Sequence, residues 1–110
     1  MSVTVIASGT QTAVISTEHT LATTSGPGVY VFWVDKANLA SGDTVELRLK
    51  TKILGGGTVR VLYIDTFTGA QPVDDMLTCS VPVVSDQAVT FTLKQTAGTG
   101  RQFPWKVLMS

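Results

Sequence analysis

Asp43-Thr-Val-Glu-Leu-Arg-Leu-Lys-Thr-Lys-Ile53 alternates apolar and polar residues in the way that a β-strand with one buried face does. Its apolar row consists of Val45, Leu47, Leu49 and Ile53. Its polar row consists of Glu46, Arg48, Lys50 and Lys52. The glycines at 55 to 57 predict that this strand turns back through a three-residue hairpin loop.

The returning strand of this hairpin, Val59-Arg-Val-Leu-Tyr-Ile-Asp65, is apolar on both faces. A three-residue loop sets three opposite pairs, which are Val59 with Ile53, Val61 with Thr51, and Tyr63 with Leu49. The alternation of side chains along a strand then decides which residues face outward.

This register leaves Leu62 and Ile64 on the outer face of the hairpin, beside Lys50 and Arg48. Apolar side chains in an outward row need a cover. Because the chain has only 110 residues, we expect another subunit to provide it.

Composition and charge restrict the classes of function. Eight Lys or Arg and eight Asp or Glu give a formal net charge of zero, which disfavours nucleic-acid binding. No stretch reaches transmembrane length, and the N-terminus lacks the basic region and long apolar run of a signal peptide. We therefore expect no membrane partner and synthesis in a cytoplasm-like compartment.

Strand-like runs separated by turn residues recur along the whole chain. We expect them at 3–7, 11–16, 19–23, 29–34, 44–53, 58–67, 78–84, 88–94 and 103–109. This pattern predicts one all-β domain over residues 1–110, a two-sheet antiparallel β-sandwich of about eight or nine strands, jelly-roll-like or immunoglobulin-like. Residues 1–10 could form an N-terminal arm or an edge strand, and residues 35–39 one helical turn capped by Asp35.

A second run, Val29-Tyr-Val-Phe-Trp-Val34, is apolar at every position, whereas a sandwich strand should bury only one face. A covering loop, the N-terminal segment or a β-bulge could explain this pattern. We favour a subunit interface, and we include Tyr30 and Phe32 in it.

Four basic residues of the hairpin, Arg48, Lys50, Lys52 and Arg60, form a stripe beside the outward apolar residues. A solvated face is the ordinary explanation, and contact with an acidic protein partner is the alternative. The predicted interface with another subunit or another protein therefore comprises Arg48, Lys50, Lys52, Arg60, Leu62, Ile64, Tyr30 and Phe32.

The residues that could carry chemistry are scattered. His19 is the single histidine and has no metal-ligand companions in the sequence, so we expect an exposed residue at a strand end. Asp74-Asp75 suits a turn, because a calcium site needs more oxygen ligands at close spacing. Asp65 falls in the inward row opposite Leu47 and needs a partner there. We predict no catalytic residue, no cofactor and no metal.

Other residues are expected to fill the core. Cys79 lies in an apolar strand-like stretch, which favours a buried thiol. Phe103, Trp105 and Val107 alternate into one face, and Pro104 suits a strand start or an edge. Trp33 and Trp105 are expected in the core, with binding of a sugar ring or a base as the alternative.

Two segments give the chain a resemblance to a known group. Leu39-Ala-Ser-Gly-Asp-Thr-Val-Glu-Leu-Arg48, with the hairpin after it, and Leu93-Lys-Gln-Thr-Ala-Gly-Thr-Gly-Arg-Gln-Phe-Pro-Trp105 resemble small virion proteins of tailed bacteriophages. The closest likeness is to β-sandwich proteins that decorate or cement icosahedral heads. The resemblance implies copies on the outer capsid surface, often as trimers, that clamp the major capsid protein.

The expected function is therefore that of a non-enzymatic, homo-oligomeric head-decoration protein, made in the cytoplasm of a host bacterium and located on the virion. The alternative is a carbohydrate- or receptor-binding module of a phage tail or fibre.

Overall fold

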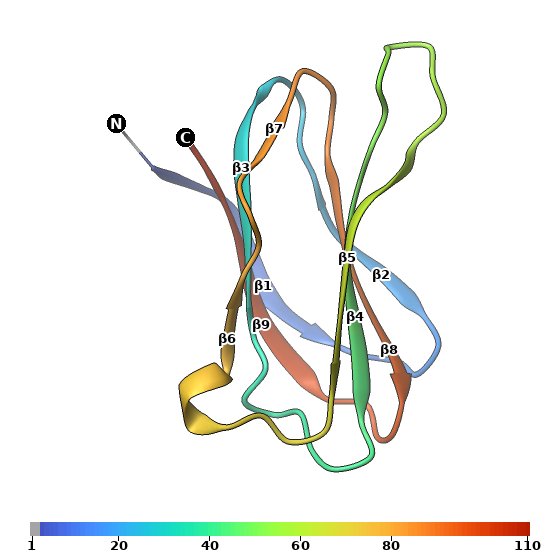
Figure 1. Cartoon of the computed structure of the whole chain (residues 1–110), viewed down its shortest axis with the longest axis vertical. Helices are drawn as coiled ribbons and strands as arrows, with labels where there is room; N and C mark the ends of the chain where they lie inside the picture. The colour runs from blue at the N-terminus through green and yellow to red at the C-terminus, as the bar shows by residue number, and fades with distance from the viewer. Residues whose placement is uncertain (1–2) are drawn as a thin grey trace.

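The protein is a two-layer β-sandwich, described for residues 3–110 by a computed structural model (Figure 1). The all-β, two-sheet prediction is confirmed. The strands are β1 (Thr4–Thr12), β2 (Glu18–Thr23), β3 (Gly28–Asp35), β4 (Thr44–Thr51), β5 (Arg60–Thr68), β6 (Leu77–Cys79), β7 (Val83–Ser85), β8 (Thr90–Ala97) and β9 (Gln102–Met109), with one short 3-10 helix, η1 (Val73–Asp75).

The strand order shows that the sandwich is jelly-roll-like and not immunoglobulin-like. Sheet A has the order β1-β9-β3-β6, with β7 also pairing with β3, and sheet B has the order β2-β8-β4-β5. β6 and β7 therefore act as one interrupted strand. The first strand then pairs with the last, the second with the next to last, and so on inward, which is the winding of an eight-stranded jelly roll.

The core lies between the sheets and is rich in aromatic residues. Phe91 of β8 meets Tyr30 and Phe32 of β3, with ring centroids 6.3 and 5.4 Å apart. Val45, Leu47 and Leu49 of β4 are buried, as their alternation predicted. The fourth residue of that row, Ile53, was predicted incorrectly, because β4 ends at Thr51 and the Ile53 side chain is 85% exposed.

Two local predictions differ from the structure. The strand predicted at 11–16 is instead the end of β1 followed by a turn, in which Ser16 adopts a positive φ of 67°. The helical turn predicted at 35–39 is a tight turn without a helix. The Asp35 carboxylate nevertheless accepts a hydrogen bond from the Ala37 N–H at 2.9 Å. The Leu39 N–H donates a hydrogen bond to the Lys36 carbonyl.

Asp43 and Arg101 fasten one end of the sandwich. The Asp43 carboxylate is buried and accepts bonds from the Arg101 Nε at 2.7 Å and from the amides of Ala40 and Thr99. Gln95 supports the same turn by donating to the carbonyls of Ala97 and Thr99 and by accepting the Arg101 N–H. These contacts bring together the two sequence segments on which the phage resemblance rests.

Candidate functional site

The first candidate site is the hairpin surface, which we define as the exposed apolar residues of β5 and of the β4–β5 loop. They are Ile53, Leu54, Val59, Val61, Leu62 and Ile64. Leu62 and Ile64 are 56% and 50% exposed, so the prediction that they face outward is confirmed. A groove of about 330 Å³ runs between the loop and the start of β5. The loop itself projects beyond the sandwich (Figure 1).

The pairing of β4 with β5 follows the predicted register only in the half of the hairpin that lies away from the loop. Tyr63 lies opposite Leu49 and Ile64 opposite Arg48, as expected. A bulge then shifts the pairing, so that Val61 lies opposite Lys50 and not opposite Thr51. The loop is also longer than the predicted three residues, because β4 ends at Thr51 and β5 begins at Arg60. Arg60 consequently lies opposite Thr51, and the predicted pair of Val59 with Ile53 does not form, because both residues lie in the loop.

The predicted basic stripe is largely neutralised within the chain. Lys50 pairs with Glu18 of β2 at 2.6 Å, and Arg48 pairs with Glu46 at 2.7 Å. The hydrogen bond from Lys50 holds the pKa of Glu18 below its usual value. Lys52 donates to the Gly55 carbonyl inside the loop. The outer face of sheet B is therefore a charge-paired surface around Arg48 and Lys50. Lys52 and Arg60 make no ion pair within residues 3–110, and Arg60 lies in the same row as Tyr63 and not in the predicted outer stripe.

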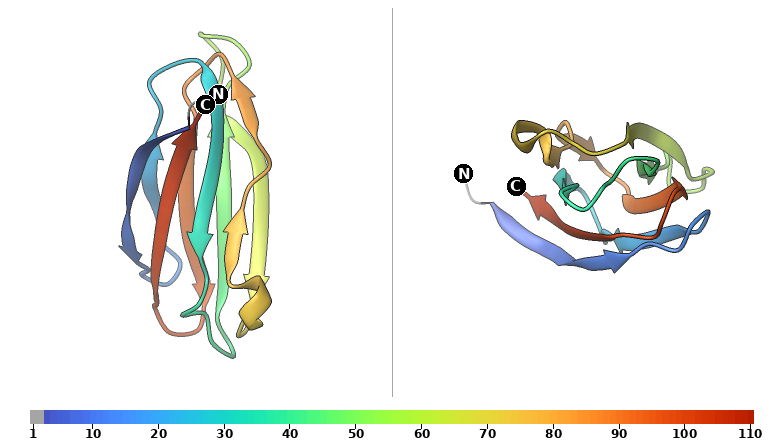
Figure 2. Two further views of the ribbon diagram at one scale, coloured as in Figure 1. Left: turned by 90° about the vertical axis from the view of Figure 1, so that its left-hand side faces the viewer. Right: turned by 90° about the horizontal axis from the view of Figure 1, so that it is seen from below.

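The second candidate site is the outer face of sheet A, which we define by the outward row of β3 and its cross-strand neighbours. The row consists of Val29, Val31, Trp33 and Asp35, and its apolar or thiol neighbours are Val5, Leu77, Cys79, Val84 and Leu108. Lys106 lies opposite Trp33 and is the charged neighbour of the row. In the left view of Figure 2, β3 and β9 face the viewer with no element drawn over them. A groove of about 410 Å³ crosses this face along Val29, Val31 and Trp33.

β3 is two-faced as predicted, but the assignment of its faces was wrong. Tyr30 and Phe32, included in the predicted interface, are each only 2% exposed and belong to the core. The half-buried Val29, Val31 and Trp33 occupy the outer face instead. Side-chain size could have indicated which row of β3 faces the core. The space between two sheets needs large residues, and Tyr30 and Phe32 fill it better than Val29 and Val31 do.

Two further core predictions are corrected on this face. Trp33 is not in the core, and its indole Nε1 has no hydrogen-bond partner among the described residues. Cys79 is exposed opposite Trp33 and is not a buried thiol. Neighbouring atoms still raise the pKa of the Cys79 thiol by desolvation, and Lys106 partly opposes that rise. Trp105, by contrast, is partly buried against the core, and Phe103 and Val107 are fully buried.

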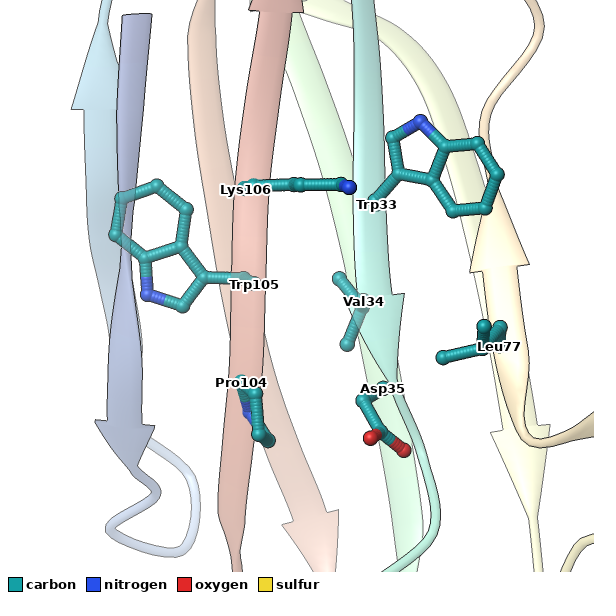
Figure 3. Close-up of a pocket in the computed structure, with 7 residues that line it drawn as sticks. All are labelled: Trp33, Val34, Asp35, Leu77, Pro104, Trp105 and Lys106. Carbon is teal, nitrogen blue, oxygen red and sulfur yellow. The ribbon is translucent and has the colours of Figure 1, made fainter. Parts of the chain in front are cut away.

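A smaller groove of about 230 Å³ lies beside Trp33 (Figure 3). Trp33, Asp35 and Leu77 line it from β3 and β6, and Pro104 and Lys106 line it from β9. The Lys106 Nζ lies 5.3 Å from the centre of a Trp33 ring. Pro104 was predicted at a strand start or an edge, but it is the third residue of β9, which lies between β1 and β3, and it lies opposite Thr10 of β1. The pairing of β9 with β3 begins at the next residue, Trp105.

The remaining polar residues make contacts within the chain. Asp65 lies opposite Leu47 as predicted but is half-buried, and its partner is the Tyr63 hydroxyl at 3.2 Å. His19 is half-buried in β2 and accepts the Val14 N–H. Asp74 and Asp75 form η1, in agreement with the predicted turn. Within residues 3–110 no cluster of three or more His, Cys, Asp or Glu could hold a metal ion, and no helix has the length and apolar character to cross a membrane.

Two buried charged residues, Asp43 and Lys36, were not predicted from the sequence. Lys36 is fully buried, with its Nζ 3.6 Å from the centre of the Phe67 ring and 3.4 Å from the Gln71 Oε1. Burial lowers the pKa of Lys36, while Asp75 and Asp65 partly restore it. No periodicity in the sequence distinguishes this lysine from a surface one.

No protein-family model, curated protein or solved structure matches the chain. The phage resemblance therefore rests on the two sequence segments quoted for it. In the structure, those segments supply the Asp43–Arg101 fastening and the two strands that lead from it.

Proposed function

We propose that the chain is a structural protein that acts by binding other proteins and not by catalysis. It forms a homo-oligomer, attaches to the outside of a tailed-phage capsid and stabilises the shell by contact with the major capsid protein. It is made in the bacterial cytoplasm and works on the virion, with the trimer as the oligomer that the resemblance implies. Each copy that binds only the assembled shell stabilises that shell by mass action.

The observation that carries this proposal is the apolar outer face of sheet A. Val84 is 79% exposed opposite Val29, and Val5 is 55% exposed opposite Leu108. A soluble monomer rarely keeps so many apolar residues together on one open sheet face, and such patches mark contact sites. Sheet B offers a different outer face, because its ion pairs already satisfy their own charges.

The jelly-roll winding supports the proposal only by analogy. Jelly rolls occur in viral capsid domains and also in lectins, so the fold is compatible with both candidate functions. The exposed residues, and not the fold, are what favour a protein-binding role.

Cosedimentation with empty heads, taken from a mutant of the encoding phage that lacks this protein, tests the proposal. The wild-type chain should pellet with the heads, and the double variant Val5→Asp with Val84→Asp should not. Val14→Asp is the matched control, because Val14 is also exposed but lies outside sheet A's outer face. Failure of the wild-type chain to pellet would contradict the proposal.

The groove beside Trp33 favours a second candidate, a carbohydrate- or receptor-binding module of a tail or fibre. An aromatic ring flanked by Asp35 and Lys106 is the combination that a sugar ring can stack on and hydrogen-bond to. Tryptophan fluorescence measured against a panel of glycans tests this candidate. Saturable quenching that is lost in Trp33→Leu would favour it over the capsid role.

A further inference from the structure

We infer that β5 pairs with β5 of a second copy of this chain, antiparallel and about a twofold axis beside Tyr63. The inference rests on the proposed homo-oligomer and specifies its contact. It replaces the trimer with a dimer as the unit built by this edge, since a contact between identical strands is closed after two copies.

The first support is that β5 is a long strand with an open edge. It ends the order β2-β8-β4-β5, so only β4 pairs with it among the described residues. Its sequence contains no proline and no lysine, which are two of the means by which proteins prevent edge pairing. Of the other edge strands, β2 has six residues and β6 and β7 have three each, whereas β1 has nine but carries no charged side chain that could pair with a second copy.

The second support is that β5 is complementary to itself in one register. Arg60, Tyr63 and Asp65 lie opposite Thr51, Leu49 and Leu47, so all three belong to the same row. The bulge makes Val61 and Leu62 together occupy one position of the ladder. Arg60 and Asp65 are therefore equally far from Tyr63, on opposite sides.

An antiparallel pair centred on Tyr63 brings complementary groups together on both faces. Tyr63 meets Tyr63 of the second copy, and each Arg60 lies opposite an Asp65. On the other face, Ile64 lies opposite Val61 and Leu62, all of which are about half exposed in the single chain. A shift of the pairing by two residues in either direction separates Arg60 from Asp65 and loses this match.

The third support is the state of the charges in the single chain. Arg60 is exposed and makes no ion pair within residues 3–110, unlike Arg48 and Lys50 of the same hairpin. Asp65 is half-buried, accepts a hydrogen bond from the Tyr63 hydroxyl and makes no ion pair within residues 3–110, although its charge also acts on the buried Lys36. An inward-facing carboxylate on an edge strand normally blocks pairing, but in the inferred dimer it lies opposite an arginine of the second copy.

Cysteine cross-linking of the purified full chain tests the register. In a Cys79→Ser background, Tyr63→Cys places two thiols at a directly opposed pair, whose Cα separation suits a disulfide. We expect oxidation to give covalent dimers. The matched control is Thr66→Cys, whose symmetry mate lies about 20 Å away along the strand and should stay monomeric. Equal cross-linking at both positions, or at neither, would overturn the inference.

Light scattering supplies a second measurement that does not depend on changing Tyr63. The wild-type chain should have the mass of two copies at tens of micromolar. Arg60→Asp should raise the dimer dissociation constant roughly tenfold, since it sets like charges opposite each other twice, and Arg60→Lys should not.

A monomeric or trimeric wild-type protein would overturn the β5 contact. Binding to empty heads tests the capsid role separately, so the two proposals can fail independently.

Discussion

At the scale of single residues, the packing around Asp43 explains why the segment at 97–101 contains two glycines. A Cβ on Gly98 would overlap the Asp43 carboxylate, and one on Gly100 would overlap the Ala13 carbonyl. Gly98 also has a positive φ of 89°. The glycines of the segment that resembles phage virion proteins are therefore needed for close packing around the buried Asp43 carboxylate and the Ala13 carbonyl.

Gly98→Ala should lower the free energy of unfolding by about 2–4 kcal/mol, because backbone strain and steric overlap act together. Thermal or urea unfolding followed by circular dichroism measures this. Gly42→Ala separates the two causes, since Gly42 has a φ of 87° but open space around it, and should cost about 1 kcal/mol. Equal losses in both variants would show that packing against Asp43 is unimportant.

Asp43→Asn should lower the free energy of unfolding at neutral pH by about 2–4 kcal/mol. Burial raises the pKa of Asp43, but the bonds from Arg101 and two amides outweigh burial, so the pKa lies below its usual value. This stabilisation is present above the unfolded-state pKa of about 4 and is lost as the pH falls through the lowered one.

Urea unfolding of wild type and Asp43→Asn at a series of acidic pH values measures this difference. The two should converge in stability as the solution is acidified. A constant gap across the acid range would contradict this role for the carboxylate.

Lys36→Met should raise the free energy of unfolding at neutral pH by about 1–2 kcal/mol, because it keeps the packing on Phe67 and removes a buried charge. In the wild type the pKa of Lys36 is lowered, so the unfolded chain binds more protons in the alkaline range and stability rises with pH there. The variant should lose that rise, as chemical unfolding at neutral and alkaline pH would show. A destabilised variant would mean that the ammonium group has stronger partners than the structure gives it.

At the scale of elements, the hairpin shows how far alternation can predict a strand pair. The inner row of β4 and the pairing of Tyr63 with Leu49 were predictable, because one face of β4 is clearly polar. The bulge and the long loop were not predictable, since Thr51 and Lys52 fit a strand as well as a loop. Thr51 ends β4 and hydrogen-bonds to the Ala88 carbonyl, a partner distant in sequence.

The ion pairs of sheet B connect β2 to β4 across β8. The Glu18 carboxylate forms an ion pair with Lys50 at 2.6 Å. It also accepts a hydrogen bond from the Thr92 hydroxyl at 2.7 Å. Glu18→Gln should therefore cost about 1 kcal/mol of stability, with a smaller cost at high salt. Because the pKa of Glu18 is lowered, this contribution should also be lost as the pH falls below about 4.

Denaturant titration at two salt concentrations checks this prediction. Glu46→Gln is the control, since Glu46 pairs with Arg48 of its own strand and links no further strand. A larger loss for Glu46→Gln than for Glu18→Gln would contradict the role of Glu18 in linking β2 to β4.

At the scale of the whole molecule, the sequence predicted the architecture better than the contact surface. Turn spacing and β-forming residues predicted a sandwich, but only the pairing of first strand with last distinguished a jelly roll. Where a strand is apolar on both faces, as β3 is, alternation cannot say which row is inside. Tyr30 and Phe32 were therefore assigned to the surface that Val29 and Val31 occupy.

The same limit applies to the predicted basic stripe. Arg48 and Lys50 were visible in the sequence, but their partner Glu18 lies on β2, far away in the chain. Ion pairs between residues distant in sequence therefore satisfy Arg48 and Lys50 within the chain. Arg60 and Lys52 make no ion pair in the described part of the chain.

The proposed function requires that this chain cover the outside of a capsid. Electron cryomicroscopy of empty heads incubated with the purified chain tests it most directly. We expect added density at fixed lattice positions on the outer shell, with the outer face of sheet A against the capsid protein. Heads that stay bare at saturating protein, or density confined to the tail, would contradict the claim.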